Sequence, residues 1–244
     1  MSSSNSSSDD EEYLQYDETK FLNLLIKQVI SGNTNQFKNL INTYYDNNHI
    51  QNQNRDEFIK TLVNTHDDLD KLMINYAISN GQLSTVKYLV ENCKADIHKK
   101  THIEFIIDDF VSPIFYAIIY THKIKNYNTI FDIIEYLLNN GANIDDKSYY
   151  HQYTPLMIAC DGRLTYDKRC INNQLKLIKF LVERCKANVN MKNYKGRTCL
   201  MLAYINSNYE IINYLENFAG ADINETCNNG FTAKEYGYCK PFDI

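Results

Sequence analysis

The feature that most constrains this chain is a segment of about 40 residues that occurs four times. Aligned on one small residue, the copies read LMINYA ending at Ala77, SPIFYA ending at Ala117, TPLMIA ending at Ala159 and TCLMLA ending at Ala203. A repeat of this length is one supersecondary unit that cannot bury its apolar face alone, so neighbouring units must stack. The repeats therefore predict an elongated array rather than one globule.

A second block follows each copy and predicts an amphipathic helix. The four blocks are residues 85–97, 133–144, 177–189 and 211–223, and they carry an aromatic residue at one shared position: Tyr88, Tyr136, Phe180 and Tyr214. Apolar residues surround it at helical spacing, as in Val86, Leu89 and Val90. This spacing places one apolar stripe along the helix.

The first block also predicts a helix. Ser112, Thr154 and Thr198 lie where a helix needs an N-cap, and Pro113 and Pro155 follow at the first helical position. A hydroxyl can accept a hydrogen bond from an unpaired amide there, and proline is tolerated because its missing N–H has no helical partner at that position. Each repeat is therefore expected to be a pair of helices.

These segments resemble the ankyrin repeat, whose signature reads T-P-L-H-x-A, then a helix ending L-L-x-x-G-A-D-V-N, then D-x-x-G. The matching segments are TPLMIA (154–159), LLNNGANI (137–144), NYKGRTCLMLA (193–203) and NNGFTA (228–233). Four repeats are clear, residues 21–41 fit a degenerate first repeat, and residues 230–237 resemble a truncated closing repeat. The resemblance implies an all-α ankyrin-repeat solenoid of stacked helix-turn-helix units with hairpin-like connections.

We expect two regions along the chain. Residues 1–18 are acidic and Ser-rich, which predicts a disordered tail, and residues 19–244 form the repeat domain. The repeats are expected at about 20–69, 70–109, 110–147, 150–192 and 193–226, with a cap at 227–244. Ser6, Ser7 and Ser8 each precede an acidic residue by three positions and are candidate phosphorylation sites, with plain solubilising disorder as the alternative.

The sequence departs from the family pattern in two ways. Extra residues lie near 101–106, 121–128 and 162–171, and residues 45–69 form a long polar gap between the first two repeats. The histidine of the TPLH tetrapeptide is replaced by Asn75, Phe115, Met157 and Met201. Because that histidine supports a hydrogen-bond network in the family, we expect a less regular and less stable array.

Composition excludes several functions. Residues 1–18 contribute −6 to a net charge of −5, so the remainder carries +1 and lacks the positive field that phosphate binding needs. We therefore expect no nucleic-acid partner. No apolar run approaches the roughly 20 residues of a membrane helix, and the start of the chain lacks a secretory apolar segment. Seven cysteines without a C-x-x-C pair indicate free thiols in a reducing compartment, so we expect an intracellular protein, cytoplasmic or nuclear.

The resemblance implies a protein–protein interaction module, whether adaptor, scaffold or inhibitor, that is monomeric by itself. Partners of ankyrin repeats contact the hairpin tips and the exposed side of the first helices, on the concave face. The matching positions are Tyr150, His151, Tyr153, Tyr194, Lys195, Arg197, Ser79, Asn80 and Tyr120. The alternatives are that these tyrosines only cover neighbouring repeats, or that the chain is a structural subunit of a larger assembly. Lys179 and Glu183 are expected to be exposed on a second helix, away from a partner.

Catalytic motifs are missing from the sequence: it has no Gly-rich phosphate loop, no G-x-S-x-G and no H-E-x-x-H. We expect no enzyme and no cofactor, with an irregular active site in residues 45–69 and the inserted loops as the alternative.

Several residue groups were weighed as chemical sites. The pair His98 and His102 has metal-ligand spacing only on a helix and has no ligand cluster nearby, so no metal site is predicted. Cys93 and Cys185 share one repeat position, which indicates a structural role. The pairs Asp108–Asp109 and Asp145–Asp146 are interpreted as solvated turn residues. Asn190 and Asn224 resemble ankyrin asparagines that an iron-dependent oxygenase hydroxylates.

Overall fold

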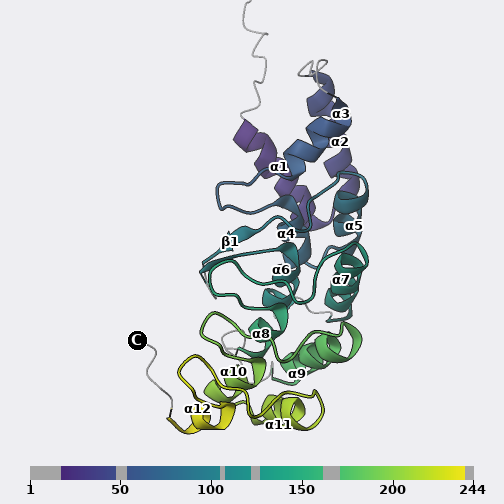
Figure 1. Cartoon of the computed structure of the whole chain (residues 1–244). Coiled ribbons are helices and arrows are strands. Elements are labelled where there is room, and N and C mark those ends of the chain that lie inside the picture. Colours follow the sequence, from purple (N-terminus) through teal and green to yellow (C-terminus); the bar gives the residue numbers. More distant parts are fainter. Residues whose placement is uncertain (1–17, 48–53, 105–107, 122–126, 162–170, 240–244) are drawn as a thin grey trace, which may run out of the picture.

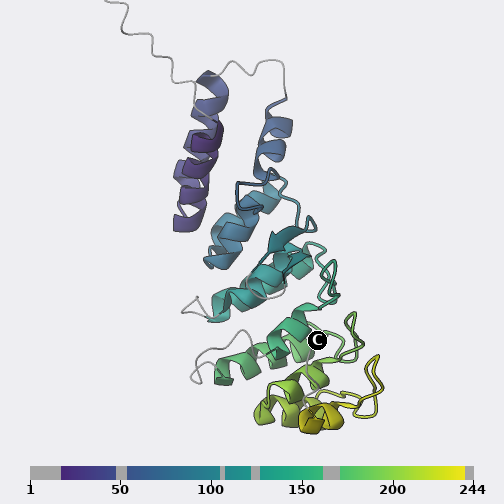
Figure 2. The same ribbon diagram turned by 90° about the vertical axis from the view of Figure 1, so that its left-hand side faces the viewer.

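The structure, a computed structural model, describes residues 18–47, 54–104, 108–121, 127–161 and 171–239. Helices in this part of the chain form two rows, and the connections between them project from one edge (Figure 1). The rows curve along the length of the stack (Figure 2). The predicted solenoid of helix pairs is confirmed.

The two rows correspond to the two predicted blocks. The first row contains α1 (Glu18–Ser31), α4 (Met73–Ser79), α6 (Pro113–Ile119), α8 (Pro155–Cys160), α10 (Cys199–Ile205) and α12 (Ala233–Cys239). The second row contains α2 (Thr34–Asn47), α5 (Leu83–Glu91), α7 (Tyr127–Asn139), α9 (Ile171–Lys179) and α11 (Tyr209–Asn217). The helix of α9 continues as a π-helical turn, η4 (Phe180–Arg184). Each member of the first row packs on the next, from α1 to α12.

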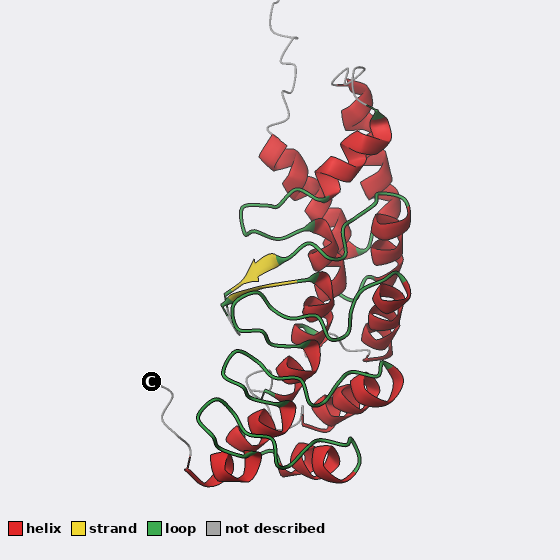
Figure 3. Ribbon diagram, viewed as in Figure 1, coloured by secondary structure: helices red, strands yellow, loops and turns green. Residues whose placement is uncertain are grey.

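Two connections carry structure of their own. Within the predicted polar gap, α3 (Arg55–Val63) begins at Asn54, whose side chain accepts a hydrogen bond from the amide of Asp56 at 2.9 Å. After α5, strands β1 (Thr101–Ile103) and β2 (Asp109–Val111) pair antiparallel (Figure 3). The helix α3 was not predicted. Residues 122–126 and 162–170 of the insertions, and the tail with Ser6, Ser7 and Ser8, lie outside the described residues.

The capping prediction is right at two positions and wrong at one. Thr154 accepts a bond from the amide of Met157 at 3.2 Å, and Thr198 accepts one from Met201 at 3.4 Å. Ser112 makes no side-chain cap, because its hydroxyl donates to the carboxylate of Asp146 at 2.5 Å. A charged acceptor forms a stronger hydrogen bond than a neutral one and directs the hydroxyl away from the helix.

The helices in the middle of the first row are short and buried. Every residue of α6 and of α8 is buried, and these helices have only seven and six residues. Helices this short are not stable alone in water. Their stability therefore comes from packing between neighbours. Because the surroundings of these helices are fully apolar, the helical periodicity of apolar and polar residues is weak in the first block.

Lysines connect successive repeats where the family histidine is missing. Lys100, Lys147 and Lys192 occupy one repeat position, and we call them the lysine ladder. The ammonium of Lys147 donates to the carbonyl oxygen of Lys192 at 3.0 Å, and that of Lys192 donates to Thr226 at 3.0 Å. Lys100 donates in the same way to the carbonyl oxygen of Lys147. Each lysine thus bonds the equivalent backbone position of the next repeat.

A second repeated bond lies two positions before the ladder. The side-chain oxygens of Asn64, Asp145 and Asn190 each accept a backbone amide of the following repeat, at 2.7, 2.9 and 2.9 Å. The amides belong to Asp96, Asn188 and Asp222. Asp145 is therefore a connecting residue and not a solvated turn residue as predicted. Its neighbour Asp146 also makes contacts, with Ser112 and with Lys100.

The aromatic residues of the second row are held by the preceding repeat. The hydroxyl of Tyr136 donates to Glu91 at 3.0 Å, and that of Tyr214 donates to Glu183 at 3.0 Å. The ammonium of Lys179 lies 5.4 Å from the centre of the Tyr214 ring. Burial, together with the neighbouring Glu91 carboxylate, raises the pKa of Tyr136 to about 12. Lys179 and Glu183 are exposed on the second row, as predicted, and both also contact Tyr214 of the next repeat.

Phe180 occupies the shared aromatic position of its repeat but has no hydroxyl, so its contacts differ from those of Tyr136 and Tyr214. Phe180 stacks on Phe131 with ring centres 4.1 Å apart. The preceding repeat has Glu135 where the others have lysine, and Glu135 pairs with Arg184 at 2.5 Å. The aromatic residue at each position thus matches the polar partners that the preceding repeat offers.

The lysine ladder predicts a specific loss of stability. Replacing Lys147 with Met keeps the aliphatic stem but removes the ammonium that bonds Lys192, and should lower the free energy of unfolding by about 1 kcal/mol. Urea unfolding followed by circular dichroism measures this. The exposed Lys234 on α12, replaced in the same way, is the control and should change stability by less than about 0.5 kcal/mol. Equal effects of the two substitutions would contradict a stabilising role for the ladder.

Candidate functional site

The hairpin tips between repeats are built on one plan. At three tips the side chain at the start accepts amides from within the turn: Asp67 from Leu69 and Lys71, Ser148 from Tyr153, and Asn193 from Lys195 and Arg197. These bonds are between 2.8 and 3.0 Å long. The side chain of the first residue closes each of these turns through hydrogen bonds to the backbone. The side chains at the centre of the tip therefore point away from the hydrogen-bonded turn.

Successive tips also bond to one another through the backbone. The amide of Tyr149 donates to Phe110 at 3.0 Å, and the amide of Tyr194 donates to His151 at 3.1 Å. At the next junction Gly196 has a φ of +72°, and a Cβ there would lie 2.4 Å from the side-chain oxygen of Asn228. Glycine is required at this position because both the backbone angle and the close approach of the next tip exclude a side chain.

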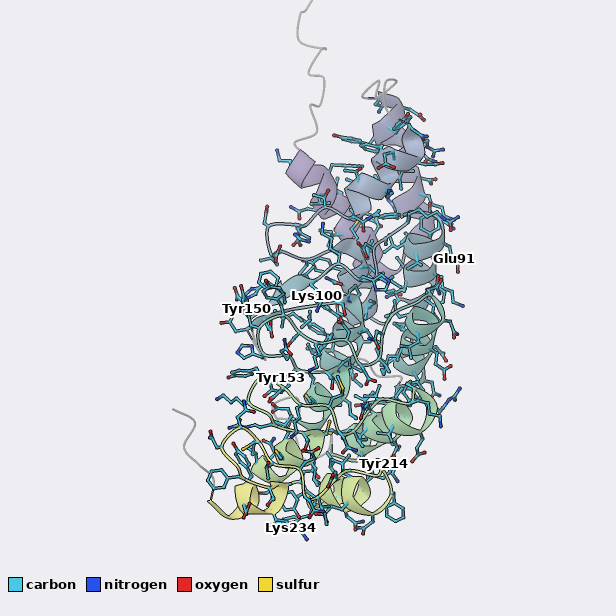
Figure 4. The ribbon with its side chains drawn as sticks, viewed as in Figure 1. Glu91, Lys100, Tyr150, Tyr153, Tyr214 and Lys234 are labelled. Carbon is cyan, nitrogen blue, oxygen red and sulfur yellow. The ribbon has the colours of Figure 1, made fainter. Side chains whose placement is uncertain are left out.

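The tips present two groups of neighbouring aromatic rings, one of Phe110, Tyr149 and Tyr150 and one of His151 and Tyr194. We call Phe110, Tyr149, Tyr150, His151 and Tyr194 the hairpin-tip strip. Ring centres lie 6.0 Å apart between Phe110 and Tyr150, 4.8 Å between Tyr149 and Tyr150, and 5.2 Å between His151 and Tyr194. Tyr150 is 60% exposed and Tyr194 is 47% exposed. Figure 4 shows Tyr150 at the loop edge of the stack, whereas Glu91 and Tyr214 lie at the second-row edge.

Asp109 holds the strip together from beneath. Its side chain is completely buried, and it accepts the amides of Tyr150 and His151 at 2.8 Å each and that of Phe110 at 2.7 Å. Burial alone would raise the pKa of Asp109, but hydrogen bonds from the Ser148 hydroxyl and these three amides outweigh burial and lower it. The prediction that Asp109 is a solvated turn residue is wrong. It is an anion buried between β2 and the next tip.

The structure separates the predicted contact residues into exposed and buried groups. Tyr150, His151 and Tyr194 belong to the strip, and Lys195 lies over the Tyr194 ring at 5.6 Å. Tyr153 and Arg197 are each only 7% exposed. The guanidinium of Arg197 donates to the Tyr236 hydroxyl at 3.2 Å and so supports the last repeat. Buried as they are, Tyr153 and Arg197 cannot present their side chains to a partner, and that part of the prediction is wrong.

The other three predicted residues lie away from the strip. Ser79 and Asn80 end α4, and both side chains bond the carbonyl oxygen of Tyr76. Tyr120 follows α6 and stacks on Tyr116 with ring centres 5.8 Å apart. These positions are at the far ends of α4 and α6 from the tips. The strip itself contains Phe110 and Tyr149, which sequence reasoning did not select, although the run SYYHQY (148–153) includes Tyr149.

The histidines and cysteines considered as chemical sites have structural surroundings. His102 lies in β1, not on a helix, and its Nε2 atom is 2.9 Å from the carboxylate of Asp108. Burial raises the pKa of the Cys93 thiol, and likewise that of Cys185, to about 11, which disfavours the reactive thiolate. Among the described residues there is no group of three or more His, Cys, Asp or Glu side chains that could hold a metal ion.

The two asparagines that resemble hydroxylation sites are exposed. Asn190 bonds the next repeat through both side-chain atoms, donating to Gly220 at 3.2 Å and accepting from Asp222 at 2.9 Å. The amide of Asn224 donates to the side chain of Asp222 at 2.9 Å. Asn190 therefore has a structural role of its own.

The family follows from comparison with known proteins. The family model described as ankyrin repeats (3 copies) matches residues 76–166 and 168–236, which is more than half of the chain. The chain is an ankyrin repeat protein. Its helix pairs and hairpin tips are the corresponding parts of that family's architecture.

Two further similarities agree with this family. The chain is 22% identical over 149 residues to the human transient receptor potential cation channel subfamily A member 1. The match covers 61% of this ankyrin chain and 11% of the channel. The fold is similar, with a TM-score of 0.59 and 20% identity, to a chain in the structure of a predatory endopeptidase from Bdellovibrio bacteriovorus in complex with an immunity protein. That likeness covers 87% of this chain and 89% of the other. Within the described residues, every helix is too short or too polar to cross a membrane.

Asp109 predicts a pH-dependent effect on the strip. Because the folded-state pKa of Asp109 is lowered, its stabilising contribution is complete above the ordinary value of about 3.9 and is lost as the pH falls through the folded value. Asp109→Asn cannot accept all three amides, so at pH 7 it should lower the free energy of unfolding by about 1–2 kcal/mol. The difference between variant and wild type should shrink below pH 4. Urea unfolding at pH 7 and pH 3 measures both.

The neighbouring carboxylate supplies a matched control. Asp108 is exposed, and its carboxylate pairs with the part-exposed His102 at 2.9 Å, so Asp108→Asn should cost less than about 0.5 kcal/mol. A loss for Asp109→Asn that is equal at the two pH values would show that the charge of Asp109 contributes nothing.

Proposed function

We propose that this ankyrin repeat protein binds a partner protein through the hairpin-tip strip. The observation that carries the proposal is the set of aromatic rings from three successive connections, which lie edge to face. The hydrogen bonds beneath the tyrosine rings run through backbone atoms, Asp109 and Asn193. Aromatic side chains are enriched among the residues that dominate interface energies. Rings that already contact one another lose little freedom on binding, which favours affinity.

The described surroundings of the strip favour recognition by contact over recognition by charge. His151 pairs with the buried Asp109 and Lys195 lies over Tyr194, so both charge-bearing groups already have a partner within the tips. A partner that buries the tyrosines must offer apolar or hydroxyl-bonding surface. Such binding suits an adaptor, a scaffold or an inhibitor that blocks another protein. We propose no catalytic role, in keeping with a family that is typically non-enzymatic.

Two exposed strip tyrosines, one on each of two successive tips, separate binding from stability. Changing Tyr150 and Tyr194 together to Ser should reduce capture of the partner from native lysate by at least about tenfold, since aromatic anchors often contribute 2 kcal/mol or more each. The melting temperature should stay within about 2 °C, because the bonds of the tips run through backbone atoms and Asp109. Affinity capture with quantitative mass spectrometry and differential scanning calorimetry measure the two effects.

The control is an exposed tyrosine on the other edge of the stack. Tyr209, at the start of α11, is 78% exposed, so Tyr209→Ser changes a comparable ring outside the strip. It should leave capture unchanged. If Tyr209→Ser weakens capture as much as the strip variant does, another surface binds the partner. If the strip variant instead melts much lower with capture unchanged, these tyrosines only cover the neighbouring repeats.

A further inference from the structure

A pocket lies at the N-terminal end of the stack, apart from the hairpin-tip strip. Its volume is about 410 Å³, within the range of small-ligand and side-chain sites. Its walls come from α1, α2, α3 and residues 65–68. The helix α3 occurs only between the first two pairs of the described stack, so the regular repeats do not reproduce this pocket (Figure 2). The strip and the pocket share no residue.

One wall of the pocket is a stack of three aromatic rings, one from each helix. The rings of Phe21 and Tyr44 are 3.8 Å apart at their centres and 12° from parallel. Phe58 continues the stack at 6.1 Å from Tyr44 and 10° from parallel. Faces of aromatic rings carry partial negative charge, so they attract cations as well as apolar groups.

The opposite wall offers acceptors and negative charge. His66 receives no partner at its buried Nε2 atom, while its Nδ1 atom lies 2.8 Å from the carboxylate of Asp70. With Nδ1 donating to that carboxylate, Nε2 of the neutral ring is an acceptor. Asp67 and Asp68 lie beside it, and Asp68 is exposed. The residues that line the pocket include no lysine and no arginine.

We propose that this pocket binds a basic side chain of a partner protein, an arginine above all. The planar guanidinium can lie against the half-buried rings of Tyr44 and Phe58 while its N–H groups reach His66 Nε2 and the Asp68 carboxylate. Charge complementarity selects this occupant over the chain's own amino-terminal segment. Residues 1–17 carry five acidic residues and no lysine or arginine, so Asp67 and Asp68 repel that segment.

Binding of an arginine side chain in this pocket can be tested with a probe that differs from its control only in charge. The ¹⁵N-labelled full chain is titrated with N-acetyl-arginine methylamide and, separately, with the citrulline analogue, whose neutral urea replaces the guanidinium. The arginine probe should shift the amide signals of residues 61–68 and of α1 in a saturable way. The citrulline analogue should bind about tenfold more weakly, because it loses the cation–ring and carboxylate interactions.

Two matched variants locate the effect. Asp68→Asn should weaken binding of the arginine probe by about threefold, whereas Glu210→Gln, an exposed acid on α11 at the other end of the stack, should leave it unchanged. Equal binding of the two probes, or an affinity that Asp68→Asn does not alter, would overturn the proposal. So would the absence of saturable binding by the full chain, which is the result expected if residues 1–17 fill the pocket.

Discussion

The structure depends on stacking, because every first-row helix after α1 is too short to stand alone. Helices of six or seven residues gain too few hydrogen bonds to offset the cost of starting a helix. In this chain, α6 and α8 are buried on every side by their neighbours in the stack. Whatever bonds one repeat to the next therefore stabilises both, and a change at one junction is felt by two helix pairs.

The junctions are held by polar bonds that repeat with the sequence. The family histidine is absent, and in its place the lysine ladder bonds backbone carbonyls across three junctions. Asn64, Asp145 and Asn190 bond the next repeat two positions earlier. Both sets use one side chain and one backbone atom. The backbone partner is present whatever the side chain there, so these junctions tolerate changes of residue at the bonded position.

Sequence reasoning could predict what depends on periodicity and local chemistry. The helix pairs follow from the repeated blocks, and the caps at Thr154 and Thr198 follow from a hydroxyl before a helix. It was wrong where a distant residue decides the outcome. Ser112 bonds Asp146, 34 positions away, and Asp109 is buried by a tip about 41 residues further on. A single sequence shows neither partner. Local chemistry alone therefore predicts a cap at Ser112 and a solvated turn at Asp109.

The strip and the second-row tyrosines show why identical residue types have different roles. Tyr136 and Tyr214 face a glutamate and a lysine of the preceding repeat, which satisfy the hydroxyl and cover the ring. Tyr150 and Tyr194 lie on tips whose hydrogen bonds run through the backbone and through Asp109 or Asn193. Stability therefore constrains the first two side chains and leaves the other two available. A partner can select the tip residues without any cost to the stack, which is why the tips, and not the helices, are the surface proposed for binding.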